Sequence, residues 1–286
     1  MPEGHTLFRL AAELTVAFAG HRVGVSSPQG RFAADAAVLD GSLLVGAGSA
    51  GKHLFVEFDH ERIVHVHLGL IGRFDVHEAG HEAAAEVPPP VGQVRLRLVA
   101  DTPRGTSYAD LRGATRCDLV GPGRREEVVA GLGPDPLRAD VDPDRAWRRI
   151  RKSPRPIGDL LLDQAVVAGV GNVYRAEVLF RQRIHPLRPG NTLRVGQWRA
   201  IWDDLGALMS EGVRLGRIDT VRPEHTPEAM GRPARADDHG GEVYVYRRTG
   251  QPCLVCDRAI RTGVLAGRNL FWCPRCQVRY RSRAVQ

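Results

Sequence analysis

The chain has 286 residues, of which 43% are hydrophobic, so it can bury one large core or two to three smaller ones. Its formal net charge of +7 favours an anionic partner. No run of about 20 apolar residues and no basic-then-apolar leader occurs, so the sequence predicts a cytosolic protein without a membrane-spanning helix.

The positive charge is carried almost entirely by arginine. The 40 Lys and Arg residues include only two lysines, Lys52 and Lys152. Arginine stays protonated and offers a planar fork, whereas lysine is a compact charge that can transfer a proton. Both lysines are therefore candidates for positions that arginine cannot fill. A lysine that enters a strand, as Lys52 does in the Gly51-Lys52-His53 run, is usually solvated, but the scarcity of lysine in this chain makes a functional role equally plausible.

The first part of the chain predicts one helix followed by strands. Apolar residues recur at spacings of three and four from Leu7 to Phe18, which predicts a helix over residues 4–19 that stops at Gly20. The predicted strands span residues 22–26, 43–45, 54–58, 63–67 and 94–99. This order favours a β-sandwich with a helix packed beside it.

After about residue 122 the pattern becomes helical. The predicted helices span residues 124–132, 143–150, 157–165, 172–181 and 195–214. Two stretches rich in proline, glycine or polar residues, 77–92 and 220–241, predict loops. Strands followed by helices indicate separate domains in an α+β chain.

Four cysteines near the C-terminus have the spacing of a zinc site. Cys253 and Cys256 form one CxxC pair, and Cys273 and Cys276 form a second pair after sixteen residues. This spacing predicts one structural Zn²⁺ held by four thiolates, with no open position for catalysis. Two strands, 259–265 and 269–273, are expected between the pairs, with Arg268 near the turn. The remaining Cys117 is expected to be a buried small residue.

Three further patterns indicate chemistry only in combination. Removal of Met1 would leave a secondary amine on Pro2 beside the Glu3 carboxylate, and an unprotonated amine can form a Schiff base. The Gly169–Asn172 turn predicts a helix that begins at Asn172 with this asparagine as a favoured N-cap, where a phosphate is favoured. Taken alone, that turn is better explained as an ordinary helical hairpin.

His65 and His67 alternate on one strand face. With no third ligand evident in the sequence, structural or DNA-facing roles are favoured over a metal pair.

Together these residues resemble the formamidopyrimidine-DNA glycosylase / endonuclease VIII family. The resemblance runs through Met1-Pro2-Glu3-Gly4, Gly51-Lys52, the Gly169–Asn172 turn with Tyr174 and Glu177, and the four-cysteine hairpin with Arg268. It implies an N-terminal β-sandwich with a flanking helix, a helix–two-turns–helix domain and a C-terminal zinc-finger β-hairpin. The expected boundaries are a catalytic β-sandwich domain at 1–122, a helical DNA-binding domain at 123–219, a mobile loop at 220–243 and a zinc finger at 244–286.

The resemblance also implies the roles of individual residues. Pro2 is expected to attack C1′ of the damaged nucleotide, with Glu3 as the neighbouring acid/base. Lys52 and Arg268 are expected to contact phosphate and to promote β- and δ-elimination respectively. Phosphate contact is expected of Asn172, and Glu177 matches a family glutamate near the active site. The resemblance leaves the role of Lys152 open, and phosphate contact is the simplest expectation for it.

Base flipping requires a side chain to fill the gap in the duplex. Leu70 is the first candidate for this wedge and Ile71 the second. Gly69 carries no side chain where relatives of the endonuclease VIII type carry glutamine.

The implied function is a monomeric, bifunctional glycosylase and abasic-site lyase of base excision repair, acting on double-stranded DNA in the bacterial cytoplasm. The Gly51–Leu54 turn and Phe271-Trp272-Cys273 resemble the endonuclease VIII branch, which prefers oxidised pyrimidines. The alternatives are a glycosylase of the 8-oxoguanine/formamidopyrimidine type and a non-catalytic zinc protein that binds damaged DNA.

Overall fold

The computed structural model describes residues 2–80, 86–236 and 241–280, and these divide into two compact units, 1–131 and 132–286. The first unit contains α1 (Gly4–Phe18), β1 (Arg22–Ser26), α2 (Ala33–Leu39), β2 (Ser42–Ala50), β3 (His53–Phe58), β4 (Arg62–His67), β5 (Arg73–Gly80), β6 (Val94–Thr102), β7 (Gly105–Arg112), β8 (Arg116–Val120) and α3 (Pro122–Gly131).

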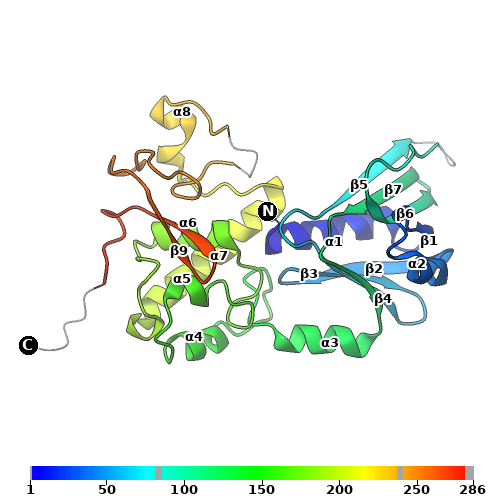
Figure 1. Cartoon of the computed structure of the whole chain (residues 1–286), viewed down its shortest axis with the longest axis horizontal. Coiled ribbons are helices and arrows are strands. Elements are labelled where there is room, and N and C mark those ends of the chain that lie inside the picture. Colours follow the sequence, from blue (N-terminus) through cyan, green and yellow to red (C-terminus); the bar gives the residue numbers. More distant parts are fainter. Residues whose placement is uncertain (1, 81–85, 237–240, 281–286) are drawn as a thin grey trace, which may run out of the picture. The chain divides into compact units, whose positions relative to one another are not determined.

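The strands of the first unit form one antiparallel sheet in the order β5-β7-β6-β1-β2-β3-β4-β8. Strand β1 joins the two halves, because it pairs with β6 through Val25 and with β2 through Val23. Figure 1 shows the β5–β7–β6 half and the β2–β3–β4 half as two layers with α1 beside them. The unit is therefore the expected β-sandwich with its flanking helix.

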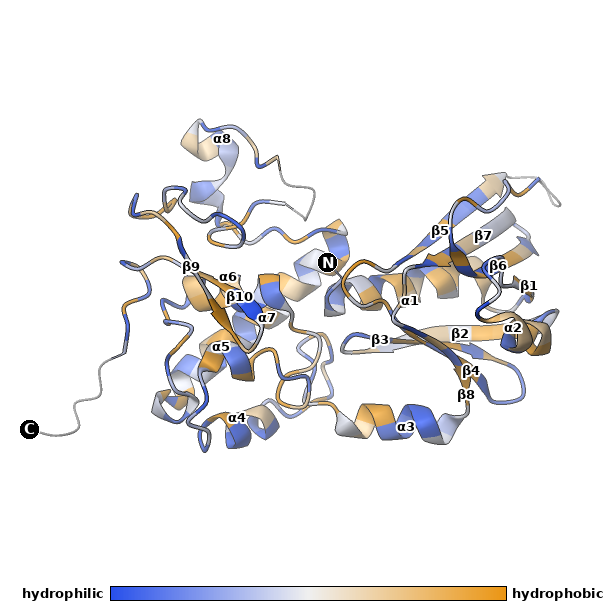
Figure 2. Ribbon diagram, viewed as in Figure 1, coloured by the Kyte–Doolittle hydropathy of each residue, from blue (hydrophilic) through white to orange (hydrophobic). Residues whose placement is uncertain are grey.

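The core of the first unit lies between these layers. Leu7, Leu10, Leu14 and Phe18 of α1 are buried, as their spacing predicts, against apolar residues of the strands. Cys117 on β8 belongs to this core, and burial raises the pKa of its thiol to about 12. It is a buried small residue, as expected. In contrast, α3 buries none of its side chains, and Figure 2 shows a hydrophilic stretch along it.

The second unit is helical and ends in a hairpin. Its elements are α4 (Asp144–Ile150), α5 (Ile157–Leu160), α6 (Asn172–Arg181), η1 (Gly190–Thr192), α7 (Val195–Leu215), η2 (Pro223–His225), α8 (Pro227–Met230), β9 (Arg261–Leu265) and β10 (Arg268–Trp272). No helix within the described ranges is long and apolar enough to cross a membrane.

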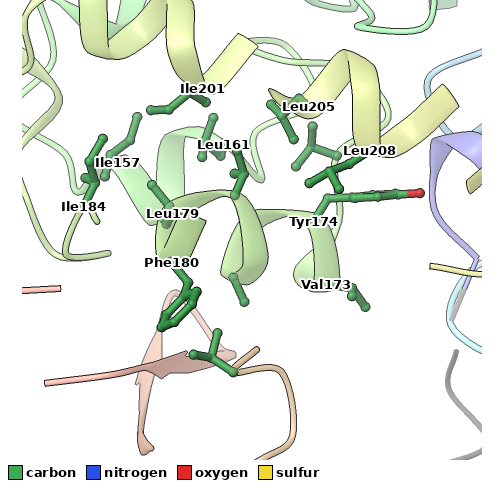
Figure 3. Close-up of a cluster of buried hydrophobic side chains, with 14 of the residues drawn as sticks. Ile157, Leu161, Val173, Tyr174, Leu179, Phe180, Ile184, Ile201, Leu205 and Leu208 are labelled. Carbon is green, nitrogen blue, oxygen red and sulfur yellow. The ribbon is translucent and has the colours of Figure 1, made fainter. Parts of the chain in front are cut away.

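One apolar cluster connects the helices of the second unit to its hairpin. Figure 3 shows Leu179 of α6 on the side that faces Ile201 and Leu205 of α7, while Phe180 points the opposite way, and Phe271 of β10 belongs to the same cluster. The zinc-binding segment therefore shares a core with the helices instead of folding as an isolated module.

Several elements differ from the sequence-based predictions. Helix α2 and strands β5, β7 and β8 were not predicted, and β5 occupies residues 77–80 of an expected loop. The predicted helix 157–165 ends at Leu160, because turns carry the chain to Gly169. Within the other expected loop, η2 and α8 form short helices. Residues 81–85 and 237–240 of these loops lie outside the described residues.

Candidate functional site

The tip of the β2–β3 hairpin carries Lys52. Ala50 pairs with His53, so Gly51 and Lys52 form a two-residue turn. Gly51 has φ of 56°, the positive value that a type II′ turn needs at its first central residue and that glycine adopts freely. Burial and, second, the charge of Lys52 lower the pKa of His67 on β4. The hairpin thus holds the lysine charge near the end of β4.

Pro2 and Glu3 lie at the start of α1. Glu3 has extended backbone at the N-cap position, and its carbonyl oxygen accepts a hydrogen bond from Thr6 N at 2.9 Å. Its side chain does not cap the helix and is 0% exposed, and Pro2 is half-buried directly before it. A buried carboxyl group next to residue 2 suits transfer of a proton at a water-poor reaction centre.

The two wedge candidates project from the turn between β4 and β5. Leu70 is 59% exposed and Ile71 is 82% exposed, which is unusual for large apolar side chains in neighbouring positions. The turn is closed by a hydrogen bond from Gly72 N to Leu68 O at 3.1 Å. A rigid, apolar tip of this kind fits insertion into a stack of bases.

Gly69 in the same turn has a structural reason to lack a side chain. Its φ is 72°, and a Cβ at this position would collide with Cγ2 of Thr115. A glutamine therefore does not fit this turn without displacement of Thr115.

The glycine turn before α6 is held by a glutamine that sequence reasoning did not identify. Gln164 Oε1 accepts a hydrogen bond from Gly169 N at 2.9 Å, and Gln164 Nε2 donates to Val170 O at 3.0 Å. Gly169 has φ of 83°. Helix α6 begins at Asn172 as predicted, but the N-cap is Gly171, so the prediction of Asn172 as the cap was wrong.

The side chain of Asn172 contacts Arg175 instead of capping the helix. Arg175 Nη2 donates to Asn172 Oδ1 and also to the main-chain oxygen of Asn269 on β10, at 2.6 Å. Arg175 is completely buried. In the sequence, the only sign of this buried residue was that Arg175 is a charged residue on the apolar side of a predicted helix. The guanidinium of Arg175 thus contacts both Asn172 and Asn269, the residue that follows Arg268.

Arg268 lies at the tip of the β9–β10 hairpin. Leu265 pairs with Arg268, so Ala266 and Gly267 form the turn, and their φ values of 48° and 71° fit type I′. Arg268 is exposed, as the hairpin prediction requires. Lys152 is also exposed, in the turn that follows α4.

Glu177 on α6 holds the segment that precedes the zinc finger. Its side chain is 0% exposed, and its two oxygens accept hydrogen bonds at 2.6–2.9 Å from Thr220 Oγ1 and from the main-chain N–H groups of Tyr244, Val245 and Tyr246. Four donors saturate a carboxylate. These contacts favour a positioning role over direct contact with DNA.

The four cysteines form a metal site. Their Sγ atoms all lie within 4.8 Å of one another, and none forms a disulfide. Tetrahedral Zn²⁺ with bonds of about 2.3 Å holds its sulfur ligands about 3.7 Å apart, so this donor set fits one zinc ion. Two of the S–S distances are 3.4 and 3.9 Å. Cys253, Cys256, Cys273 and Cys276 are the ligands of one structural zinc, as predicted.

The chain matches three models of known domains. Residues 1–117 match the formamidopyrimidine-DNA glycosylase N-terminal domain, residues 132–223 match its H2TH domain, and residues 250–278 match the zinc finger found in FPG and IleRS. The first match ends before α3, and the second begins where the second unit begins.

Curated relatives cover nearly the whole chain. Endonuclease 8 1 of Mycobacterium tuberculosis is 53% identical over 278 residues, which are 97% of this chain and 100% of that protein. Formamidopyrimidine-DNA glycosylase of Chloroflexus aggregans is 33% identical and covers 85% of this chain and 84% of that protein.

Solved structures share the fold. The Lactococcus lactis Fpg protein in complex with DNA that contains an abasic site superposes with a TM-score of 0.76 at 23% identity, over 97% of this chain and 100% of that one. The same protein bound to DNA that contains N7-benzyl-Fapy-dG gives a TM-score of 0.76 at 22% identity.

Proposed function

Because the chain belongs to the formamidopyrimidine-DNA glycosylase family, whose members are DNA glycosylases and abasic-site lyases of base excision repair, we propose that it is a bifunctional enzyme of the endonuclease 8 type. The observation that carries this proposal is the 53% identity with endonuclease 8 1 of Mycobacterium tuberculosis over 97% of the chain. The partner is double-stranded DNA with damaged bases or abasic sites, and the protein acts as a monomer in the bacterial cytoplasm.

In the proposed reaction the nitrogen of Pro2, freed by removal of Met1, attacks C1′ of the damaged nucleotide. A bond forms between this nitrogen and C1′, the bond from C1′ to the base breaks, and the base leaves with the proton that the nitrogen gives up. Glu3 supplies the proton that opens the sugar ring, and its burial beside Pro2 supports this role.

The resulting iminium makes the C2′ proton acidic. Loss of this proton expels the 3′ phosphate, and a second elimination expels the 5′ phosphate. Lys52 contacts phosphate and promotes the first elimination, while Arg268 contacts phosphate through its planar fork and promotes the second. The exposure of Arg268 at a hairpin tip and the placement of Lys52 at another support these contacts.

Asn172, at the first turn of α6, and Lys152 make further phosphate contacts in this proposal. Leu70 fills the gap left by the flipped nucleotide, with Ile71 as the second candidate for this wedge. Glu177 serves by holding residues 220 and 244–246 in place, since its oxygens are occupied there.

Oxidised pyrimidines are the proposed substrates. A second candidate is the removal of 8-oxoguanine and formamidopyrimidines, which the 33% identity with a protein named formamidopyrimidine-DNA glycosylase favours. Duplex oligonucleotides that each carry one defined lesion distinguish the two. Faster cleavage at thymine glycol or 5-hydroxycytosine supports the first candidate, and faster cleavage at 8-oxoguanine supports the second.

Trapping of the covalent intermediate tests the reaction. Borohydride should reduce the iminium and leave a protein–DNA adduct at residue 2, located by mass spectrometry of the peptide. The variant Pro2→Gly should trap less because a primary amine with a different geometry replaces the ring nitrogen. Cleavage of an abasic duplex without any reducible adduct, or retention of Met1 in the active protein, contradicts the mechanism.

A further inference from the structure

Three imidazole rings lie together on one face of strands β3 and β4. The ring of His53 has its centroid 5.1 Å from that of His65 and 5.2 Å from that of His67. His65 also stacks on Phe55 at 4.8 Å. Because Lys52 precedes His53 in the hairpin turn, this cluster adjoins a residue proposed to contact phosphate.

The protons on His65 can be placed from its contacts. Its Nε2 lies 2.9 Å from Nδ1 of His53, while its own Nδ1 is buried and has no hydrogen-bond partner within the described part of the chain. Burial lowers the pKa of His65 to about 4, so the ring is neutral and carries one proton. A buried N–H without a partner is rarer than a buried lone pair without one. The proton therefore lies on Nε2 and is donated to His53.

The tautomers of the other two rings follow. His53 accepts this hydrogen bond at Nδ1, and burial lowers its pKa to about 4, so its single proton lies on Nε2. Nδ1 of His67 lies 3.2 Å from Gly69 N and 3.0 Å from Thr115 Oγ1. A main-chain N–H can only donate, so Nδ1 accepts from Gly69 and the proton of His67 lies on Nε2. His53 and His67 thus both carry an Nε2–H donor beside Lys52.

The charges around this cluster favour an anion. Burial is the largest cause of the lowered pKa of His67, followed by the charges of Lys52 and Arg116. The pKa of His65 is lowered by burial first, then by Arg116, His67 and Arg124. The two acidic residues of this face are paired, Glu57 with Arg125 at 2.7 Å and Asp118 with Arg116 at 3.0 Å. A metal ion is disfavoured because the lone pair of His53 Nδ1 already accepts a hydrogen bond.

We propose that His53 binds a phosphodiester group of DNA through Nε2–H next to Lys52, and that His65 is a positioning residue that sets the tautomer of His53. This role rests on the proposed function, since it deepens the phosphate contact assigned to Lys52. A neutral donor adds a directed hydrogen bond to the point charge of the lysine.

Nuclear magnetic resonance of the free protein tests the positioning part. Long-range ¹H–¹⁵N spectra distinguish the two neutral tautomers of histidine. We expect Nε2–H for His53 and His65 at pH 7, and a mixture of tautomers for His53 in the variant His65→Phe, which keeps the contact with Phe55. An Nδ1–H tautomer of His53 in the unaltered protein overturns the proposal.

Binding of a duplex with an uncleavable abasic analogue, followed by fluorescence anisotropy, tests the phosphate part without catalysis. We expect His53→Phe to raise Kd about tenfold, the effect of one hydrogen bond to a charged group. His65→Phe should raise it by a similar factor, and His65→Gln, which retains an N–H donor, should recover most of the loss. The double variant should bind no more weakly than His53→Phe alone.

The matched control is His60→Asn, in the exposed turn between β3 and β4, where φ is 56° and asparagine is tolerated. It should leave both Kd and the His53 tautomer unchanged. If His53→Phe binds the duplex as tightly as the unaltered protein does, the phosphate contact of His53 is overturned but the proposed function is not. Failure of the unaltered protein to prefer the abasic duplex overturns the proposed function as well. If His65→Phe does not fold, the comparison of His53→Phe with the unaltered protein still decides the phosphate contact.

Discussion

The Nη2 atom of Arg175 on α6 lies 2.6 Å from the main-chain oxygen of Asn269 on β10, although 94 positions separate the two residues. The same nitrogen donates to Asn172 Oδ1. One buried guanidinium therefore fixes both a candidate phosphate ligand in the helical domain and the strand residue next to Arg268.

Replacement of Arg175 should disturb both contacts at once. We expect Arg175→Ala to cost about 1–3 kcal/mol in the free energy of unfolding, because the Asn269 oxygen loses its donor. Binding of a duplex with an abasic analogue should weaken about tenfold or more, since Asn172 and Arg268 lose their common support. Urea unfolding and fluorescence anisotropy measure the two effects. Arg199→Ala, on the solvent side of α7, is the control, and equal binding by both variants would contradict the role of Arg175.

Glu177 should prove essential for the order of the segment before the zinc finger. In Glu177→Gln an amide NH₂ replaces one oxygen and faces N–H donors, so about 2–4 kcal/mol of stability should be lost. Limited proteolysis should then cut between residues 220 and 243 faster than in the unaltered protein. Glu224→Gln, at an exposed residue within the same stretch, should show no change. An unaltered cleavage rate in Glu177→Gln would mean that these hydrogen bonds are dispensable.

The wedge should affect chemistry on a paired base more than stability. Leu70 and Ile71 are largely exposed, so Leu70→Ala should leave the melting temperature within about 1 °C. Excision of a damaged base from duplex DNA should fall about tenfold to a hundredfold, because the unstacked state loses its filler. Cleavage at a preformed abasic site should fall less. Single-turnover kinetics on the two substrates measure this difference, and Ile71→Ala should have the smaller effect of the two.

Loss of zinc should unfold the finger locally. Cys253→Ser removes a thiolate from the tetrahedral set, so the zinc content, measured by mass spectrometry of the metal, should fall from one per chain to near zero. Near-ultraviolet circular dichroism of Trp272 on β10 should change at the same time. Cys117→Ala, outside the metal site, should retain the zinc. Full zinc content in Cys253→Ser would show that three ligands suffice.

The free energy of unfolding should decrease as the pH falls below about 6.5, the pKa of histidine in an unfolded chain. Burial lowers the pKa of His5 and of His65 to about 4, from 6.5 in an unfolded chain. Between pH 6.5 and 4 the unfolded state binds more protons than the folded state, so stability present above pH 6.5 is lost as the pH falls to 4. For the buried His65 the loss is on the order of 1–3 kcal/mol. Thermal unfolding at pH 7 and pH 4.5 should show a smaller decrease for His65→Asn, and an equal decrease would contradict this origin.

The sequence predicted the features that depend on local pattern. The apolar spacing from Leu7 to Phe18 determines α1, because a period near 3.6 places those side chains on one buried face. The two CxxC pairs determine the zinc site, because four thiolates at this spacing have few other uses. The strands with an alternating or wholly apolar pattern were also predicted, because that pattern too is local in the sequence.

Elements whose residue types depend on contacts with other segments of the chain were not predicted from the sequence. Strand β7 contains Asp110, whose buried carboxylate accepts two hydrogen bonds from Arg97 on β6 and one from Arg112. Polar residues of this kind obscured the strand pattern. The helix predicted over 157–165 ends early because Gln164 bonds to the glycine turn, a contact that spacing does not reveal.

For this protein the sequence by itself determined which groups are available for chemistry: a proline and a glutamate at the start of the chain, two lysines, and four cysteines at metal spacing. Only the tertiary structure decided which partners hold them. Arg175 meets Asn269, Glu177 meets residues 244–246, and His65 meets His53 through distances that depend on how helices and strands pack. Local pattern fixes the identity and face of a side chain, whereas its hydrogen-bond partner is set by chain segments that lie far away in the sequence.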